Sequence, residues 1–234
     1  MSNSSQIINW ENIFKQSSKF QNQKPFRFGF VEEFFYKDFY EKLYETYPTI
    51  DDKWIESSDH SKFQMNRFWG DNTKANQVVE DNYDSSWSKE WNELKNYAHS
   101  NEFISNFRTF SGVTIDKIKH FHLIRLKKGG FQLPHIHNVG PSTLVLMIYF
   151  SKNWIDGSPG GTYMATEEDE SKIIFEPYNL DNSIALFHDG PNAAHGTRYI
   201  TNDVDRRALQ ITLEGYSIEN GWSGGKKKTE LREI

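Results

Sequence analysis

Two histidines, two residues apart, are the clearest sign of chemistry in this sequence. His135 and His137 lie in the segment LPHIHN, directly after a proline. On an extended strand, side chains two residues apart point to the same side. Neutral imidazole is a good ligand for iron, copper, zinc and nickel. The pair therefore predicts one side of a metal site.

A third histidine on a later strand-like run completes a candidate ligand set. His195 is followed by glycine in AHG, and antiparallel strands can bring it beside His135 and His137. Three protein ligands on one side of a metal leave positions open for a substrate and dioxygen. The chain contains no cysteine, so His, Asp or Glu must hold any metal.

The remaining histidines favour a structural interpretation. His120 and His122 form a second same-face pair in KHFHLIRL. We expect both to line the interior or to pack against aromatic rings. His188 would be a ligand only if the HDG turn pointed inward.

Two consecutive arginines open the last strand-like run, and alternation sends them to opposite faces. Arg206 shares its face with Ala208, Gln210 and Thr212, whereas Arg207 shares its face with apolar residues. A buried guanidinium without a counter-charge is costly, so an inward Arg206 implies an anion. The planar fork of the guanidinium matches a carboxylate. Arg207 takes this role if the register differs by one residue, and an ordinary surface pair is the alternative.

The first half of the chain has helical periodicity. Phe35, Phe39, Leu43 and Tyr47 recur at four-residue spacing and predict an amphipathic helix that ends before Pro48. Two further helices are expected, at 87–98 and 102–110. A strand is expected within 26–35, and residues 54–82 have no clear period and are interpreted as a long loop.

From residue 115 onward the pattern changes to about eight short β-like runs separated by turns. Such a series without intervening helices predicts a sandwich, a jelly roll or a double-stranded β-helix. The expected fold class is α+β, mainly β, with a double-stranded β-helix core and supporting N-terminal helices. The expected organisation is an arm (1–24), a single domain (25–217, with its β core at about 115–216) and a charged tail (218–234).

Composition limits the partners. The net charge of -5 argues against nucleic acid as the main partner. No apolar run approaches the length of a membrane span. The segment MSNSSQIINW lacks the basic and apolar parts of a secretory signal, so we expect a cytoplasmic protein without a membrane partner.

The order of these segments resembles a known family. From about 26 to 216 the chain is similar to the iron(II)- and 2-oxoglutarate-dependent oxygenases, in particular their prolyl 4-hydroxylase-like branch. The similar segments are HLIRLKKGGFQLPHIHN around the metal motif, STLVLMIYFSKNW with GGTYMA, NSIALFHDGPNAAHGTRYI and DVDRRALQITLEGY.

The resemblance implies roles for individual residues. His135 and His195 would bind iron(II), and Arg206 would bind the far carboxylate of 2-oxoglutarate, the co-substrate, assisted by Tyr149 and Thr212. The implied reaction consumes dioxygen and hydroxylates an unidentified substrate, prolyl, peptidyl or small-molecule. It is coupled to decarboxylation of 2-oxoglutarate to succinate.

His137 departs from the family pattern, which usually has aspartate at this position. Three alternatives follow: His137 is a third ligand, a carboxylate such as Asp189 or a water completes a two-histidine site, or the site is degenerate. The spacing from Gly129 to His135 and His137 also partly fits a cupin motif, although the expected glutamate is missing. A cupin-like three-histidine dioxygenase that does not use 2-oxoglutarate, and a non-catalytic metal-binding module, are therefore the alternative functions.

Overall fold

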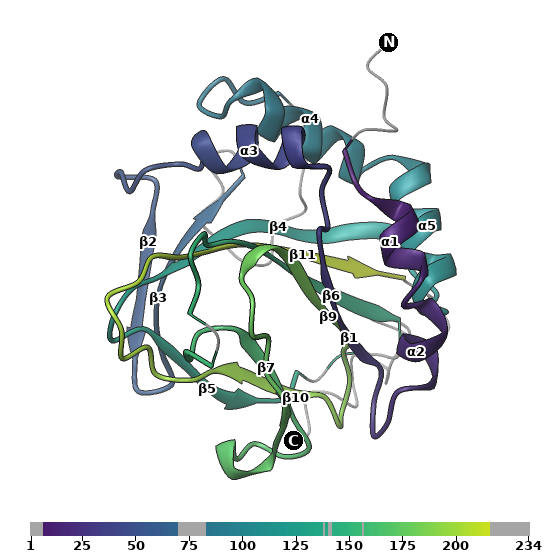
Figure 1. Cartoon of the computed structure of the whole chain (residues 1–234), viewed down its shortest axis with the longest axis vertical. Helices are drawn as coiled ribbons and strands as arrows, with labels where there is room; N and C mark the ends of the chain where they lie inside the picture. The colour runs from purple at the N-terminus through teal and green to yellow at the C-terminus, as the bar shows by residue number, and fades with distance from the viewer. Residues whose placement is uncertain (1–6, 70–82, 138, 140–141, 156, 216–234) are drawn as a thin grey trace, which may run out of the picture.

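The computed structural model describes residues 7–69, 83–137, 139, 142–155 and 157–215. Its centre is a curled antiparallel sheet whose strand order is β1-β9-β6-β11-β4-β3-β5-β10-β7-β8, with β2 paired to β3 (Figure 1). The strands are β1 Phe28–Glu32, β2 Ile55–Asp59, β3 Lys62–Phe68, β4 Lys117–Leu126, β5 Phe131–His135, β6 Thr143–Phe150, β7 Thr162–Ala165, β8 Ile173–Phe175, β9 Asp181–His188, β10 Ala194–Thr197 and β11 Arg206–Glu214.

The curl brings the two ends of the sheet together and forms a barrel-like interior. Rings on β1 and β8, the terminal strands, are in contact: Phe175 lies 5.7 Å from Phe28 and 6.0 Å from Phe30, measured between ring centroids. The short strands β5, β10 and β7 thereby lie opposite β4, β11, β6 and β9 (Figure 1). The predicted mainly-β double-stranded β-helix is confirmed.

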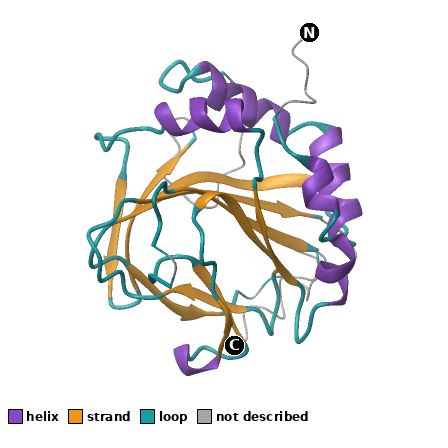
Figure 2. Cartoon of the chain, viewed as in Figure 1, coloured by secondary structure: helices purple, strands orange, loops and turns teal. Residues whose placement is uncertain are grey.

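Helices from the first half of the chain cover one outer face of the sheet (Figure 2). Ser88 and Ser100 cap α4 and α5 by accepting hydrogen bonds from main-chain N–H groups, and Gly112, at a φ of 65°, ends α5. The expected helices at 87–98 and 102–110 are confirmed. The helices are α1 Trp10–Phe14, α2 Ser17–Asn22, α3 Lys37–Glu45, α4 Lys89–Ala98, α5 Asn101–Ser111 and the 3₁₀ turn Glu170–Lys172.

The sheet separates two apolar regions. Leu123, Leu209 and Ile211 point outward and pack with the helices. Ile124 and Ala208, one residue away on β4 and β11, belong to a second cluster inside the barrel. Both faces of these strands are therefore largely buried, as their burial patterns show.

The prediction of a long loop at 54–82 is wrong for the first part of this segment, which forms the β2–β3 hairpin. The Asp59 carboxylate closes the turn by accepting hydrogen bonds from the main-chain N–H groups of Ser61 and Lys62. The strands were missed because the inner face of β3 carries polar residues, so hydrophobicity does not mark the buried side. Residues 70–82 lie outside the described part of the chain.

The N-terminal arm packs against the domain. Phe20 is fully buried, and the Trp10 indole N–H donates a hydrogen bond to the Tyr97 hydroxyl at 2.7 Å. The expected tail at 218–234 lies outside the described residues. Among the helices of the described residues, none has the length and apolar character needed to cross a membrane.

Candidate metal centre

Three histidines meet at one end of the barrel interior. His135 on β5 and His195 on β10 are directly opposite each other in the sheet, and His137 lies two residues past the end of β5. Their ring centroids are 4.3 to 4.9 Å apart. One nitrogen from each ring can be chosen so that all three lie within 4.8 Å of one another. The structure thus brings together the three residues expected as ligands.

Hydrogen bonds behind the rings decide which nitrogen faces the centre. Nδ1 of His135 lies 3.0 Å from the Leu133 carbonyl oxygen, and Nδ1 of His195 lies 2.9 Å from that of Ala193. A carbonyl oxygen can only accept, so each Nδ1 carries the proton. In the neutral ring Nε2 then has a free lone pair, which is the form that binds a metal.

His137 is held by a carboxylate instead of a carbonyl. Its Nδ1 lies 2.6 Å from Oδ2 of Asp189, which is 2% exposed. The other carboxylate oxygen accepts the Gly190 N–H at 2.9 Å. Asp189 is therefore placed behind His137, against Nδ1, while Nε2 is left for the metal. A carboxylate in this position orients the ring and makes it a more basic ligand.

Burial keeps the imidazoles of His135 and His195 neutral. It lowers the pKa of His195 well below the usual value, and the neighbouring rings of His135 and His137 lower it further. The pKa of His135 is also lowered, mainly by burial. Neutral rings are the ones that can donate a lone pair, so these two histidines can bind a metal at neutral pH.

A buried arginine lies deeper in the interior. Arg206 is 1% exposed, and it donates from Nε to the Gly160 carbonyl at 3.0 Å and from Nη2 to the Thr162 hydroxyl at 3.2 Å. Its Nη1 is buried and has no hydrogen-bond partner among the described residues. None of these contacts is a carboxylate. Burying a guanidinium without a counter-charge is unfavourable, so the site calls for an anionic ligand.

Tyr149 completes this anion site. Its ring lies 5.2 Å from the guanidinium of Arg206. The Tyr149 hydroxyl accepts the Thr162 main-chain N–H at 2.8 Å, which leaves its own proton to donate to a ligand. Burial raises the pKa of Tyr149, so the hydroxyl keeps that proton. Sequence reasoning missed Thr162, because its position after a Gly-Gly pair does not indicate a contact with Arg206.

The metal cluster and the anion site are a short distance apart. Thr162 pairs with Thr197 across the β7–β10 ladder, and Thr197 is two residues from His195. This separation is about 7 Å along the strand. A small dicarboxylate therefore has the length to reach from the metal cluster to Arg206.

The structure does not bring the other expected residues to this anion site. Thr212 is on the same face as Arg206 but six residues further along β11, about 20 Å away. Its hydroxyl accepts a hydrogen bond from the Gln210 side chain. Arg207 points outward, where it pairs with Asp205 at 2.8 Å and lies 5.2 Å from the Tyr44 ring.

The second histidine pair lines the interior at some distance from the cluster. His122 is 8% exposed and stacks on Phe68, with ring centroids 5.0 Å apart. Burial lowers the pKa of His122 to about 3. The His120 ring is 6.2 Å from that of His122. The His188 main-chain N–H donates a hydrogen bond to the Arg27 carbonyl, and its side chain is not part of the three-histidine cluster.

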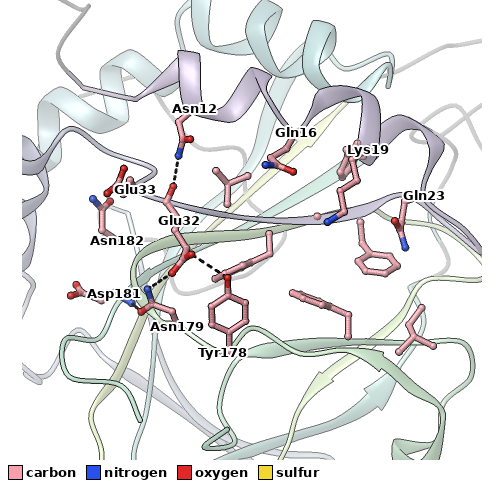
Figure 3. A pocket seen from close by; sticks show the side chains of 17 residues that line it. Asn12, Gln16, Lys19, Gln23, Glu32, Glu33, Tyr178, Asn179, Asp181 and Asn182 are labelled. Atoms are coloured by element: carbon pink, nitrogen blue, oxygen red, sulfur yellow. Dashed lines mark hydrogen bonds between the residues drawn. The ribbon is translucent and has the colours of Figure 1, made fainter. Parts of the chain in front are cut away.

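A groove of about 860 Å³ lies outside the barrel, between α1–α2, β1 and the segment before β9 (Figure 3). The Asn12 side chain donates to the Glu32 carbonyl there. The Glu32 carboxylate accepts hydrogen bonds from Tyr178 and Asn179. None of the three clustered histidines lines this groove, so it is separate from the metal centre.

Comparison with known proteins places the fold. No protein-family model and no curated protein matches the sequence. Among solved structures, a prolyl-4-hydroxylase from Pseudomonas putida is similar, at 9% identity, a TM-score of 0.63 and coverage of 89% of this chain and 100% of that chain.

Two others have bound molecules. A prolyl hydroxylase from Trichoplax adhaerens, in complex with a peptide fragment of hypoxia inducible factor, is 13% identical, with a TM-score of 0.55. The match covers 87% of this chain and 88% of that chain. HygX from Streptomyces hygroscopicus, with nickel, 2-oxoglutarate and hygromycin B bound, is 10% identical, with a TM-score of 0.52. The match covers 87% of this chain and 86% of that chain. At these identities the likeness establishes the fold, and this chain has the double-stranded β-helix fold found in 2-oxoglutarate-dependent oxygenases.

Proposed function

We propose that this chain is an iron(II)- and 2-oxoglutarate-dependent dioxygenase that hydroxylates its substrate. The observation that carries the proposal is the pairing of two sites in one interior. Three histidines can hold a metal. Arg206, which is buried and has no counter-charge among the described residues, donates to Thr162, and Thr162 lies about 7 Å further along the strand direction. A short dicarboxylate that binds a metal at one end satisfies both sites.

The metal would be held by Nε2 of His135, His137 and His195. All-imidazole donors suit iron(II) and other first-row metals, and three ligands leave coordination positions for a co-substrate and dioxygen. When bound, iron(II) supplies the redox chemistry by which dioxygen, with loss of carbon dioxide from 2-oxoglutarate, oxidises a C–H bond.

The chain's own residues would hold and orient the co-substrate. Arg206 and the Tyr149 hydroxyl donate hydrogen bonds to the far carboxylate, and Thr162 fixes both of them through its hydroxyl and its main-chain N–H. Burial of the guanidinium excludes water, which strengthens these charge-assisted hydrogen bonds.

The aspartate that the family usually has as a ligand is replaced here by a histidine and a carboxylate behind it. Asp189 would supply its negative charge to the metal through the His137 ring, at a hydrogen-bond distance of 2.6 Å. The total charge of the centre would then match that of the usual site, while the ligating atoms are all nitrogen.

A cupin-like dioxygenase that does not use 2-oxoglutarate is the second candidate, and the all-histidine cluster favours it. Arg206 distinguishes the two candidate functions, because a dioxygenase that does not use 2-oxoglutarate has no need of a dicarboxylate site. The substrate class also stays open between a peptide, as bound by the Trichoplax enzyme, and a small molecule, as bound by HygX.

An anaerobic titration of the iron(II)-loaded protein with 2-oxoglutarate tests the proposal. A visible charge-transfer band from the chelated metal is expected, and Arg206→Met should raise the half-saturating concentration at least tenfold. Arg207→Met is the matched control on the outer face, and it should leave the titration as in the wild type.

Two results would contradict the proposal. Iron binding without a band favours the cupin-like dioxygenase. Failure to bind iron leaves a module without this chemistry. Thermal denaturation of both variants checks that they are folded, so that loss of the band in Arg206→Met is not mistaken for unfolding.

A further inference from the structure

Polar side chains gather on the inner face of β3, β4 and β11, where a barrel core would be apolar. His122 lies between Phe68 on β3 and Gln210 on β11, as their cross-strand pairing shows. In the next row His120 pairs with Thr212. We call this surface the polar wall; its members are Gln64, Asn66, His120, His122, Gln210 and Thr212.

The polar wall shares its interior with the metal centre. Thr212 pairs with Val145, and Val145 pairs with Phe187. The Phe187 ring centroid is 4.4 Å from that of His195. With strands about 4.8 Å apart, the wall begins about 10 Å from Phe187. A molecule of modest size can touch both.

The wall contains a buried polar atom that lacks a partner. Nδ1 of His122 is buried and has no hydrogen bond among the described residues. The ring is 8% exposed and neutral, so each nitrogen is either one donor or one acceptor. Leaving such an atom without a partner is unfavourable, which indicates that a ligand supplies one.

Two amides on the same face of β3 as Phe68, the cross-strand partner of His122, are joined by hydrogen bonds. The Gln64 amide donates to the Asn66 side chain at 2.8 Å, and the Asn66 amide donates to the Ser57 hydroxyl at 3.0 Å. Gln64 and Asn66 are 8% and 6% exposed. Their positions are fixed by these bonds, so they can recognise a polar ligand without reorganising.

A lysine adds a positive charge next to the wall. Lys62 is on the same face of β3 as Gln64 and pairs with Gln132 of β5. It forms no ion pair with the described residues, although Asp59 is near enough to interact at longer range. Gln132 is three residues before His135 on β5, so the Lys62 position lies about 10 Å along this strand from the metal centre.

Charge balance in the interior favours an additional anion. Iron(II) and Arg206 would contribute three positive charges, which Asp189 and a bound 2-oxoglutarate would cancel. Lys62 is then left over. A buried or half-buried excess of positive charge is stabilised by a negative ligand.

We propose that Lys62 and the polar wall form the substrate site, and that the substrate is a polar molecule carrying an oxyanion, a carboxylate or a phosphate. This inference rests on the proposed function, because it takes the three-histidine cluster as the reacting centre. Lys62 binds the oxyanion. His122 and Gln64 bind hydrogen-bonding groups on the same molecule.

Calorimetric titration of the nickel- and 2-oxoglutarate-loaded protein tests this without turnover. The probes are N-acetylglycine, its neutral counterpart N-acetylglycinamide, and methyl phosphate. At least one anionic probe should bind ten or more times more tightly than the neutral amide, and comparing the two anions distinguishes carboxylate from phosphate. Lys62→Gln should remove this preference, whereas the exposed control Lys53→Gln should keep it.

A second variant separates hydrogen bonding from charge. His122→Phe should weaken the acid and the amide of the N-acetylglycine pair by a similar factor, because both present the same acetamide group. Melting curves establish that each variant is folded at the temperature of the titration.

Three results would overturn the inference. The first is equal affinity for the acid and the amide, and the second is no binding of any probe at 50 millimolar, roughly the weakest affinity that calorimetry can follow. The third is a Lys62→Gln variant that loses affinity for 2-oxoglutarate and not for the probes. A failure of the proposed function would give a different result from a failure of this inference. If iron and 2-oxoglutarate give no charge-transfer band while nickel-loaded protein keeps Lys62-dependent anion binding, the anion site stands and the oxygenase assignment falls.

Discussion

Asp189→Asn is the substitution that most directly tests how this centre is built. The change keeps the size of the side chain and removes its charge. In the wild type one carboxylate oxygen lies 2.6 Å from His137 Nδ1 and the other accepts the Gly190 N–H at 2.9 Å. The asparagine oxygen can replace only one of these acceptors, and its amide group would face a hydrogen-bond donor in the other position.

The expected loss is a 10- to 100-fold lower metal affinity, the usual effect of removing a carboxylate behind a ligating histidine. This corresponds to about 1.4 to 2.8 kcal/mol of binding free energy. Because Asp189 is 2% exposed, water cannot take over the hydrogen bond, and the effect should lie towards the upper end.

Nickel affinity measured by competition with a chromogenic chelator gives the result without any turnover. Asp51→Asn is the matched control, since Asp51 pairs with Arg67 outside the interior. That variant should bind nickel as the wild type does. If Asp189→Asn binds within twofold of the wild type, the carboxylate has no part in metal binding and the interpretation of His137 as its oriented partner is refuted.

Three further predictions follow from the same geometry. His137→Asp alone should bind metal more weakly than the double variant His137→Asp with Asp189→Asn, because the single variant places a second carboxylate near the buried Asp189. Chelator competition on both variants measures this non-additivity. His122→Phe should lose less stability than the wild type when the pH falls. The folded-state pKa of about 3 lies below the unfolded value, so the unfolded state binds the extra proton and the wild type loses about 2.5 kcal/mol between pH 7 and 4.5 from this group. Urea denaturation at both pH values checks it, and equal losses would contradict it. Gly196→Ala should lower both the melting temperature and nickel affinity, because an added Cβ would lie 2.6 Å from the Gln132 carbonyl oxygen and would push β10 away from β5; unchanged nickel affinity would show that the strand pair absorbs the clash.

Sequence reasoning succeeded where a local rule decides the outcome. The spacing of His135 and His137 and the glycine after His195 predicted a cluster that the structure assembles. Alternation on β11 placed Arg206 inside and Arg207 outside, and the structure has them so. The faces of these residues follow from the period of a strand, whereas the meeting of His195 with the other two rings depends on the pairing of β10 with β5. Their role as metal ligands stays a prediction.

The same rule failed where position along the strand matters. Thr212 shares a face with Arg206, yet six residues separate them, and the distance follows from strand rise alone. Thr162 could not be found, because its contact with Arg206 joins residues 44 positions apart and depends on the curl of the sheet. The hairpin that contributes Gln64 and Asn66 was missed because a polar interior reverses the usual hydrophobic pattern.

Arg206 links opposite walls of the barrel, and this has a consequence for motion. The residue is on β11, at the centre of the sheet order, while its hydrogen-bond acceptors Gly160 and Thr162 are next to or on β7, a four-residue strand one place from the edge. Short strands near an edge open at low free-energy cost. Each local opening of β7 would release both bonds of the guanidinium at once. A ligand bound at Arg206 would therefore slow amide hydrogen exchange in β7 and β8, so the rigidity of this edge reports whether the anion site is filled.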